Sequence, residues 1–289
     1  MNKLTAITFD DFLARNKPFE TSNCTFDISG FSLISPSALV QLAAACYGLA
    51  HCGRKAIIII DDYRVISFLK RTGFITVIKG IARIENKSFI TSILTYPFID
   101  SSNPLLLEVS KIADPSAISE LLNRVISQLI NQLNYRKHDA YDVATAISEI
   151  CQNIFDHNQS TCGFVAMQVY GHSIDKRFIE IGIADYGDGL TNTLSRNPRN
   201  LPLESDLSAI KLAIQPRVSE FLDDPTRGTG LRHMMDIAFK HQGTVQIRSG
   251  KANMRFRMDK RQGWGFSVSH MPGVQLTLTL KSKERLDKY

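Results

Sequence analysis

The second half of the chain is organised by the stretch Asp139–His157, DAYDVATAISEICQNIFDH. Its apolar residues recur at the spacing of one buried helical stripe: Val143, Ala146, Ile147, Ile150 and Ile154. A second, polar stripe runs beside the first, because Glu149, Asn153 and then Asp156 or His157 stand about one helical turn apart. The stretch therefore predicts an amphipathic helix with functional groups on one face.

The start of this helix and its polar face both carry oxygen ligands. Asp139 is expected to cap the helix, with Asp142 in the first turn, where an acid complements the helix dipole. A carboxylate and a carboxamide one turn apart suit a hard cation such as Mg²⁺. Glu149 can also accept a proton from water or a hydroxyl. An ordinary solvated face has the same pattern, so this helix alone leaves both interpretations open.

The composition is that of a globular protein with a mild basic excess. The 289 residues are enough for one large or two small domains, and 44% hydrophobic residues support a full core. A net charge of +6 fits an anionic ligand such as a nucleotide. The sequence lacks dense Lys/Arg runs interleaved with aromatic residues, which argues against a nucleic-acid partner. The basic clusters 251–261 and 281–288 fit a solvated hairpin and a tail.

Cysteine usage and hydropathy predict a cytoplasmic protein without a membrane partner. The five cysteines form no CxxC pair, which is typical of reduced and mostly buried thiols. Polar and charged residues interrupt the first twenty positions, so no signal peptide is expected there. No apolar run in the sequence approaches the length of a membrane span.

The first third of the chain alternates between strand and helix patterns. Ser35 is expected to cap a helix over Pro36–Ala50, since proline is favoured at a first helical position. Lys55–Ile60, KAIIII, has the length and β-branching of a buried strand. Asp62 is expected to cap a second helix, Val65–Lys70. This spacing predicts an α/β module with helices packed on a sheet.

A connecting region separates this module from the organising helix. Ile75–Val109 alternates apolar and polar residues between turn signals, which predicts further strands. We place the boundary near residue 95, between domains 1–95 and 96–289. Asp114 and Pro115 then open a long helix, whose apolar stripe either covers a sheet or forms a homodimer seam. Few charges flank the stripe, which favours the packing role.

Three segments of the first eighty residues carry a family resemblance: FDISGFSLISPSALVQL, KAIIII and VISFLKRTGF. Together they resemble the STAS domain of anti-anti-sigma factors. That family commonly carries D-S-S-G, with a phosphorylatable serine, where this chain has Ser35-Pro36-Ser37-Ala38. The Asp and Gly are absent, and Ser37 falls at the second serine position. Ser37 is therefore either a phosphorylation site or an ordinary residue of the first helical turn.

Two glycine-containing loops follow the organising helix. Phe164–Tyr170 and Phe178–Ala184 are expected to be strands, and the second ends at Asp185. A carboxylate at a strand end can accept a hydrogen bond from an exocyclic amino group. Gly187 and Gly189 would let the backbone approach a flat ring, although many β-turns also have the pattern D-x-G-x-G.

The second loop closes a long segment between core elements. Leu190–Arg227 is expected to be a lid or binding loop with one short helix, Leu207–Ile214, capped by Asp206. A further helix then opens with exposed backbone N–H groups suited to a phosphate, with charge added by Arg227 and Arg232. A plain tight turn is the alternative. The helix opens at Arg227-Gly228-Thr229-Gly230-Leu231, and its expected buried stripe is Leu231, Met234, Met235, Ala238 and Phe239.

The three motifs occur in one order: E-x-x-x-N on a helix, D-x-G-x-G at a strand end, and G-x-G-L opening a helix. This series resembles the N, G1 and G2 boxes of the GHKL superfamily, the histidine-kinase-like ATPases with the Bergerat fold. The anti-sigma-factor serine kinase branch is the most similar. The resemblance covers roughly Asp114–Leu280. It implies an α/β sandwich, in which a mixed sheet has helices on one face, with ATP and Mg²⁺ as cofactors.

The resemblance also implies a role for each motif residue. Glu149 matches the general base, Asn153 matches the Mg²⁺ ligand and Asp185 matches the carboxylate that reads adenine. Family members often have Thr after the glycine of the last strand, where this chain has Val274; Thr277 or Thr279 compensates only if the register allows it. Gly187 and Gly189 match the hinge of the lid, and Gly228 and Gly230 match the glycines that face the phosphates. The nucleotide-binding stretch comprises Arg227, Gly228, Thr229, Gly230 and Leu231.

The function implied is that of an ATP-binding regulator of the anti-sigma-kinase type. It would hydrolyse ATP or phosphorylate a partner protein on Ser/Thr. The alternative is a non-catalytic switch, in which ATP orders the lid and so controls partner binding. The implied partner is a STAS-like or sigma/anti-sigma-type regulator. A DNA-handling role, as in GHKL subunits of topoisomerases, is disfavoured because only about nine residues follow the last expected strand.

Overall fold

The computed structural model describes residues 2–86, 106–113, 116–157, 162–216, 218 and 229–283. Helices and strands are mixed along the chain, which confirms the predicted α/β class. The predicted domain boundary near residue 95 lies outside the described residues. Among the residues described, no helix combines the length and the apolar character needed to cross a bilayer. All five cysteines are free, and Cys46, Cys151 and Cys162 are buried as expected.

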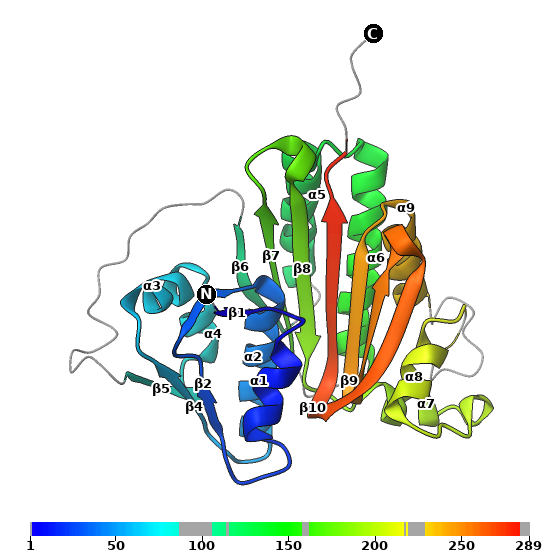
Figure 1. The fold of residues 1–289 in the computed structure, drawn as a ribbon. Coiled ribbons are helices and arrows are strands. Elements are labelled where there is room, and N and C mark those ends of the chain that lie inside the picture. Colours follow the sequence, from blue (N-terminus) through cyan, green and yellow to red (C-terminus); the bar gives the residue numbers. More distant parts are fainter. Residues whose placement is uncertain are drawn as a thin grey trace.

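The first part of the chain forms a small module of short strands and helices (blue and cyan in Figure 1). Its three-stranded sheet has the order β2-β4-β5 with parallel neighbours, and a separate parallel pair joins β1 and β3. The elements are β1 (Asn2–Leu4), α1 (Phe9–Asn16), β2 (Thr25–Asp27), β3 (Phe31–Ile34), α2 (Pro36–His51), β4 (Ala56–Ile60), α3 (Tyr63–Arg71), α4 (Phe74–Ile78) and β5 (Ala82–Asn86).

Local signals set most of these boundaries. Ser35 caps α2 by accepting a hydrogen bond from the backbone N–H of Ala38, and Asp62 caps α3 through the N–H of Arg64, as predicted. The prediction of strands from Ile75 onward is wrong for α4. Gly73, at φ +70°, precedes α4, and the β-branched residues after it form a helical turn whose Phe74 and Ile78 are buried. Tertiary packing has overridden β propensity there.

The second part of the chain is built on a five-stranded antiparallel sheet of order β6-β7-β8-β10-β9 (Figure 1). The last strand in sequence, β10, therefore lies between β8 and β9. The prediction of a mixed sheet with helices on one face is wrong for the described residues: each of these strand pairs is antiparallel, and α2 covers the second face. The elements are β6 (Leu106–Ile112), α5 (Ser116–Leu133), α6 (Lys137–His157), β7 (Gly163–Tyr170), β8 (Phe178–Asp185), α7 (Gly189–Ser195), α8 (Asp206–Ala213), α9 (Gly230–Lys240), β9 (Thr244–Arg257) and β10 (Gln262–Lys281), with short 3₁₀ turns at Ile174–Lys176, Pro198–Asn200 and Met258–Lys260.

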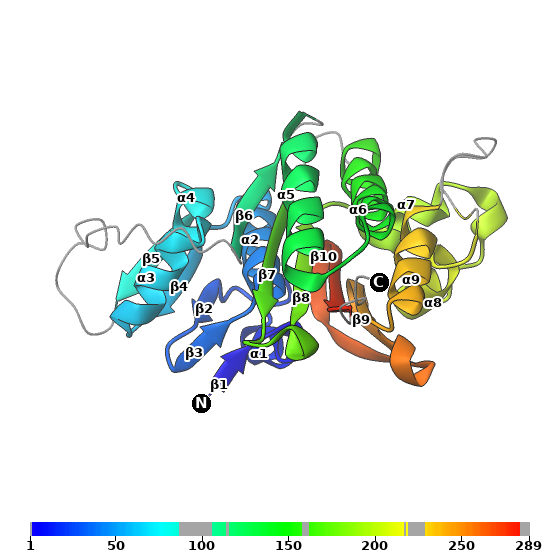
Figure 2. The ribbon, with the colours of Figure 1, turned by 90° about the horizontal axis from the view of Figure 1, so that it is seen from above.

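The two faces of this sheet are covered by different parts of the chain (Figure 2). Helices α5, α6 and α9 lie on one face, called here the helical face, and their apolar stripes form one core with Ile179, Ile181 and Ile183 of β8. Helix α2 packs on the other face, called the docking face, where Phe164 and Ala184 join the core of the N-terminal module. Strand alternation sends neighbouring side chains into the two cores.

Helix α2 approaches the docking face very closely. Gly182 of β8 has no room for a side chain, because a Cβ there would lie 2.5 Å from Ser37 Cα. The backbone N–H of Ser37 donates to Glu180 Oε1 at 3.2 Å, so a carboxylate of the sheet lies at the N-terminus of α2. A negative charge stabilises a helix at that end. The N-terminal module is thus fixed to the sheet by backbone packing and by a capping charge.

Candidate functional site

Helix α6 presents Glu149 and Asn153 on one half-buried face. The helix begins at Lys137, so the prediction that Asp139 caps it is wrong: Asp139 lies inside the first turn and forms an ion pair with Lys240 at 2.6 Å. The predicted apolar stripe is confirmed, since all five of its residues are buried in the helical-face core. The side chains of residues 156 and 157, the last predicted members of the polar stripe, lie outside the described residues.

The start of α9 lies directly against this face of α6. A Cβ on Gly230 would lie 3.2 Å from Asn153 Nδ2 and 3.2 Å from Glu149 Cβ, which is tighter than an ordinary contact. Glycine therefore allows the two helices to meet where both predicted motifs lie. The hydroxyl of Thr229 lies 3.4 Å from Glu149 Oε2. The structure thus brings Glu149, Asn153, Thr229 and Gly230 together.

His233 is a member of this group that the motif analysis missed. Its Nδ1 lies 3.3 Å from Glu149 Oε1, and the two side chains are 32% and 34% exposed. A carboxylate only accepts hydrogen bonds, so Nδ1 carries the hydrogen in this contact. His233 follows Thr229 by four residues, which puts both side chains on one face of α9. That spacing was the sequence signal for the contact.

The structure describes only some of the other residues predicted at the phosphate loop and the helix that follows it. Arg227 and Gly228 lie outside the described residues. Leu231 packs against the helical-face core, as predicted. Arg232 forms an ion pair with Asp236 one turn along α9, at 3.0 Å. The prediction that Phe239 is buried is wrong: it is 52% exposed and lies under the guanidinium of Arg261.

Asp185 ends β8 as predicted, and its side chain is nearly fully buried, at 6% exposure. Its Oδ1 accepts the backbone N–H of Gly187 at 2.8 Å, and its Oδ2 accepts that of Val274 at 3.3 Å. Gly273, at φ +81°, permits this close turn, because a Cβ there would lie 2.2 Å from the Asp185 carbonyl oxygen. The carboxylate is therefore held in one orientation by backbone donors.

Asp185 lies at the same end of the helical layer as Asn153. In the β7–β8 ladder, Asp185 is opposite Gly163, and a Cβ on Gly163 would lie 2.4 Å from Ile154 Cδ1. Ile154 directly follows Asn153 on α6. Asp185 also shares the strand parity of Ile183, which faces α6. Figure 1 shows the end of β8, the last turns of α6 and the α7–α8 region at this lower end of the molecule.

The segment after Asp185 differs from the predicted lid. Gly189, at φ +76°, begins helix α7, which the sequence analysis missed, and the N–H of Leu190 donates to Ser249 Oγ at 2.9 Å. Helix α8 is capped by Ser205, and the prediction of Asp206 as the cap is wrong. The Asp206 carboxylate instead accepts hydrogen bonds from the Thr191 hydroxyl and from the Lys251 N–H. These contacts join α7, α8 and β9.

The register of β10 decides the question raised by Val274. Leu276, Leu278 and Leu280 belong to the helical-face core. Alternation then directs Thr277 and Thr279 to the opposite face, away from α6. Neither threonine can replace the missing hydroxyl at Val274 on the helical face. The contact that the family resemblance implies there has no equivalent at either threonine.

Neither a family model nor a curated protein matches this sequence. The chemistry of the site therefore rests on its own residues. A half-buried carboxylate and carboxamide lie against a helix N-terminus, and a buried carboxylate lies at the same end of the sheet. This set offers oxygen ligands, backbone N–H donors and an oriented acceptor.

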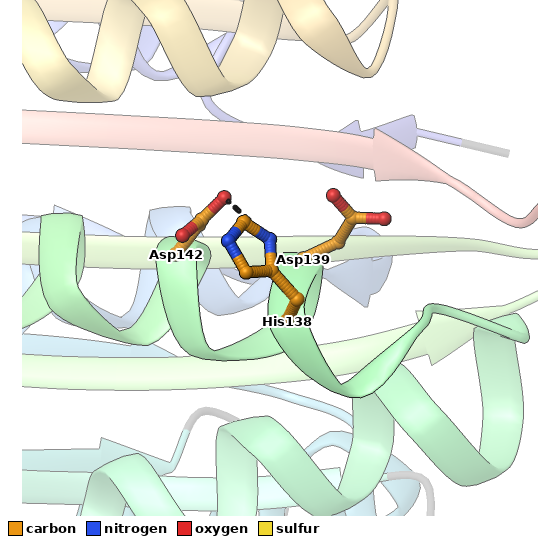
Figure 3. A group of neighbouring side chains, drawn as sticks. All are labelled: His138, Asp139 and Asp142. Atoms are coloured by element: carbon orange, nitrogen blue, oxygen red, sulfur yellow. Dashed lines mark ion pairs between the residues drawn. The ribbon is translucent and has the colours of Figure 1, made fainter.

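A second acidic group lies at the far end of α6. His138, Asp139 and Asp142 have ligand atoms close enough to hold a metal ion, and Figure 3 shows His138 beside Asp142, at 3.3 Å. Lys240 of α9 already pairs with both carboxylates, at 2.6 and 2.9 Å. These contacts account for the cluster as an ion-pair network, which joins the first turns of α6 to the last turn of α9.

Ser37, the residue suggested by the STAS resemblance, is fully buried on the docking face. Its Oγ has no hydrogen-bond partner among the described residues, and its backbone lies against Gly182 of the sheet. A phosphate would lack space here, and the carboxylate of Glu180, which accepts the Ser37 N–H at 3.2 Å, would repel its charge. The arrangement is incompatible with phosphorylation of Ser37 while α2 is docked.

Proposed function

We propose that the second part of the chain is a GHKL-type, Bergerat-fold module that binds ATP·Mg²⁺. It would hydrolyse ATP or transfer a phosphoryl group to Ser/Thr of a partner protein, as in the anti-sigma-factor serine kinases. The observation that carries this proposal is the contact of Glu149 and Asn153 of α6 with the first residues of α9. Glu149 and Thr229 are 80 residues apart in sequence, yet their side chains meet.

The residues at this point fit the proposed cofactors. Asn153 supplies a neutral oxygen, and Mg²⁺ commonly takes one or two protein oxygens together with phosphates. The N-terminus of α9 offers backbone N–H groups and the positive end of a helix dipole to an anion. Mg²⁺, when bound, would neutralise charge on the transferred phosphoryl group. Glu149 would accept a proton from the attacking water or hydroxyl.

Asp185 fits recognition of the adenine amino group. Its Oδ1 accepts the N–H of Gly187 and its Oδ2 accepts the N–H of Val274, which orients the carboxylate at the end of β8. An oriented carboxylate is a suitable acceptor for an exocyclic amine. The family resemblance implies the same contact. Gly189 begins a helix tied to Ser249, which supports a hinge confined to the Asp185–Gly189 turn.

A non-catalytic ATP switch is the second candidate, and one contact favours it. Glu149 is engaged by both Thr229 and His233, so its carboxylate is partly satisfied before any substrate is present. In the switch, Glu149 would hold α9 against α6, and ATP would alter that contact. The partner in either case would be a STAS-like or sigma/anti-sigma-type protein. An ATP-dependent role and five free thiols fit a cytoplasmic protein.

The deciding experiment measures ATP affinity by calorimetry and phosphate release by the full chain. Glu149→Ala should bind ATP and lose turnover by about 100-fold or more, the scale of general-base catalysis. Asn153→Ala should lose both binding and turnover. Asp236→Asn, on the exposed side of α9, is the matched carboxylate control and should behave as wild type.

Three outcomes separate the candidates. Loss of turnover in Glu149→Ala with retained binding supports the enzyme. Absence of turnover in wild type, with ATP-dependent protection of α9 in hydrogen exchange, supports the switch. Wild-type protein that does not bind ATP with Mg²⁺ contradicts both candidates.

A further inference from the structure

A buried ion pair joins the N-terminal module to the hairpin of β9 and β10. Asp10 of α1 accepts from Arg248 Nε at 2.9 Å, and Arg248 is fully buried. Arg255 and Asn253 of β9 also donate to Asp10. Taking a guanidinium out of water is costly unless a counter-charge and hydrogen bonds replace the solvent. Asp10 supplies that counter-charge, so the burial of the charged Arg248 side chain depends on the docking of α1.

Arg248 in turn fixes the side-chain amide of Gln275 in β10. Its Nη1 donates to Gln275 Oε1 at 3.4 Å. The other end of the amide, Nε2, donates to the carbonyl oxygens of Pro272 at 2.8 Å and Asp185 at 3.2 Å. A guanidinium can only donate and a carbonyl can only accept, so this amide has one consistent orientation. Without the Arg248 donor, Gln275 Oε1 loses this hydrogen bond, and the amide is held by its Nε2 end alone.

Gln275 holds the corner where β8 and β10 meet beside Asp185. Its amide connects the Pro272 carbonyl with the Asp185 carbonyl across the turn at Gly273. The next residue of that turn, Val274, supplies the N–H that Asp185 Oδ2 accepts. A change in the Gln275 contact therefore moves a donor that orients the Asp185 carboxylate.

We propose that Asp10, Arg248 and Gln275 form a buried relay by which the N-terminal module positions Asp185. The three are positioning residues: none would touch the ligand, and all are less than 8% exposed. Their effect should appear in recognition of the base and not in contacts to phosphate. Only the identity of the ligand rests on the proposed function, because the relay itself is defined by contacts of the chain.

Two variants break the relay at different points. Gln275→Met removes the amide and leaves the Asp10–Arg248 pair intact. The double variant Asp10→Asn with Arg248→Met removes the fully buried guanidinium together with its carboxylate, because removal of one alone would leave the other uncompensated. The partly exposed Arg255 loses its ion pair with Asp10 in this variant. Glu20→Ala is the matched control. Glu20 also joins the N-terminal module to the hairpin, by accepting the His270 N–H at 2.8 Å, but it does not contact Gln275.

The first measurement needs no nucleotide. Amide hydrogen exchange at Gly187 and Val274 reports the hydrogen bonds that these two amides donate to the Asp185 carboxylate. Both amides should exchange about tenfold faster in Gln275→Met and in the double variant, as expected for loss of one hydrogen bond. Glu20→Ala should match wild type. If the double variant does not fold, Gln275→Met decides the question by itself.

The second measurement compares affinities for ATP and inosine triphosphate, which carries a carbonyl in place of the amino group. Both relay variants should reduce the preference for ATP about tenfold and change inosine triphosphate affinity little. If both relay variants exchange at the wild-type rate and keep the wild-type preference for ATP, the relay is overturned and the proposed function still stands. Wild-type protein that binds neither nucleotide would overturn the proposed function, while the exchange rates would still decide the relay.

Discussion

The two faces of the five-stranded sheet bury polar groups in opposite ways. On the helical face, Glu149 and His233 contact each other while each stays about one-third exposed. On the docking face, Arg248 is fully buried and paired, and other buried polar atoms have no partner among the described residues, including Ser37 Oγ, Gln41 Oε1, Asn253 Oδ1 and Thr277 Oγ1. Groups that stay half exposed are available to a ligand, whereas the buried pair holds two parts of the chain together.

This difference separates residues that set affinity from residues that set stability. A half-exposed hydrogen bond contributes little net free energy, because water competes for both partners. A buried ion pair is costly to break, because the remaining charge loses its compensation. Substitutions at the buried contacts of the docking face should therefore change unfolding, and those at the half-exposed Glu149 and His233 should change binding or turnover.

The largest effect is expected where α2 meets the sheet. Gly182→Ala places a methyl group 2.5 Å from Ser37 Cα and 2.9 Å from Ser37 N, both backbone atoms that cannot rotate away. Overpacking of this kind should lower the free energy of unfolding by about 3 kcal/mol. Urea unfolding followed by circular dichroism measures this free energy.

Gly230→Ala is the counterpart on the helical face and should change the free energy of unfolding by less than about 1 kcal/mol, since its neighbours are side-chain atoms at 3.2 Å. Equal stability of the two variants would remove the distinction between the faces.

An intermediate effect is expected at His241, which is buried. Neither ring nitrogen has a hydrogen-bond partner among the described residues, and the ring lies 4.8 Å from that of Tyr135. Burial, with a contribution from Lys283 and against the opposing effect of Asp139 and Asp142, lowers the pKa of His241 from 6.5 to about 4. Below pH 6.5 the unfolded chain binds a proton that the folded protein does not, so stability falls from pH 6.5 to about pH 4 and levels off below it.

His241→Phe tests this effect because it keeps the ring and removes the titration. Between pH 7.5 and 4.5 the wild type should lose roughly 2 kcal/mol more stability than the variant. Urea unfolding at both pH values gives the difference. Parallel loss in the two proteins would mean that His241 accepts a proton without cost. Arg248 provides the contrast, since it is buried in an ion pair with Asp10 at 2.9 Å.

The smallest effect is expected at the contact between His233 and Glu149. His233→Leu should lower ATP turnover about fivefold, the equivalent of one modest hydrogen bond, and should leave stability unchanged. His233→Asn places an amide N–H near the position of Nδ1 and should restore most of the rate. Steady-state phosphate release with both variants is the measurement. A wild-type rate in His233→Leu would show that the carboxylate is positioned by other contacts.

Much of the helical face could be predicted from the sequence because its signals are local. The stripe of α6, the strand that ends at Asp185 and the helix that opens at Gly230 are all encoded within short windows. The sequence-based prediction was wrong where a neighbouring residue or tertiary packing outweighed the local signal. Ser205 took the cap position expected for Asp206, and Phe74–Ile78 folded as a helix although its residues favour strands.

The docking face could not be predicted from such windows. Asp10 and Arg248 are 238 residues apart, and neither residue carries a periodic signal for the other. The close approach at Gly182 depends on a helix from another part of the chain. His233 was missed for a related reason: it belongs to no motif, and its contact with Glu149 appears only when α9 lies against α6.

The central place of β10 has a consequence for how the chain acquires its structure during synthesis. β10 is the last strand to be made, yet it pairs with β8 on one side and β9 on the other. The ribosome therefore releases α1 and α2 long before the surface that receives them is complete. Until β10 inserts, the edge of β8 is uncovered, a state in which nascent chains bind chaperones or associate with one another. Completion of the sheet, and of the β10 surface that α1 contacts, thus waits for that strand.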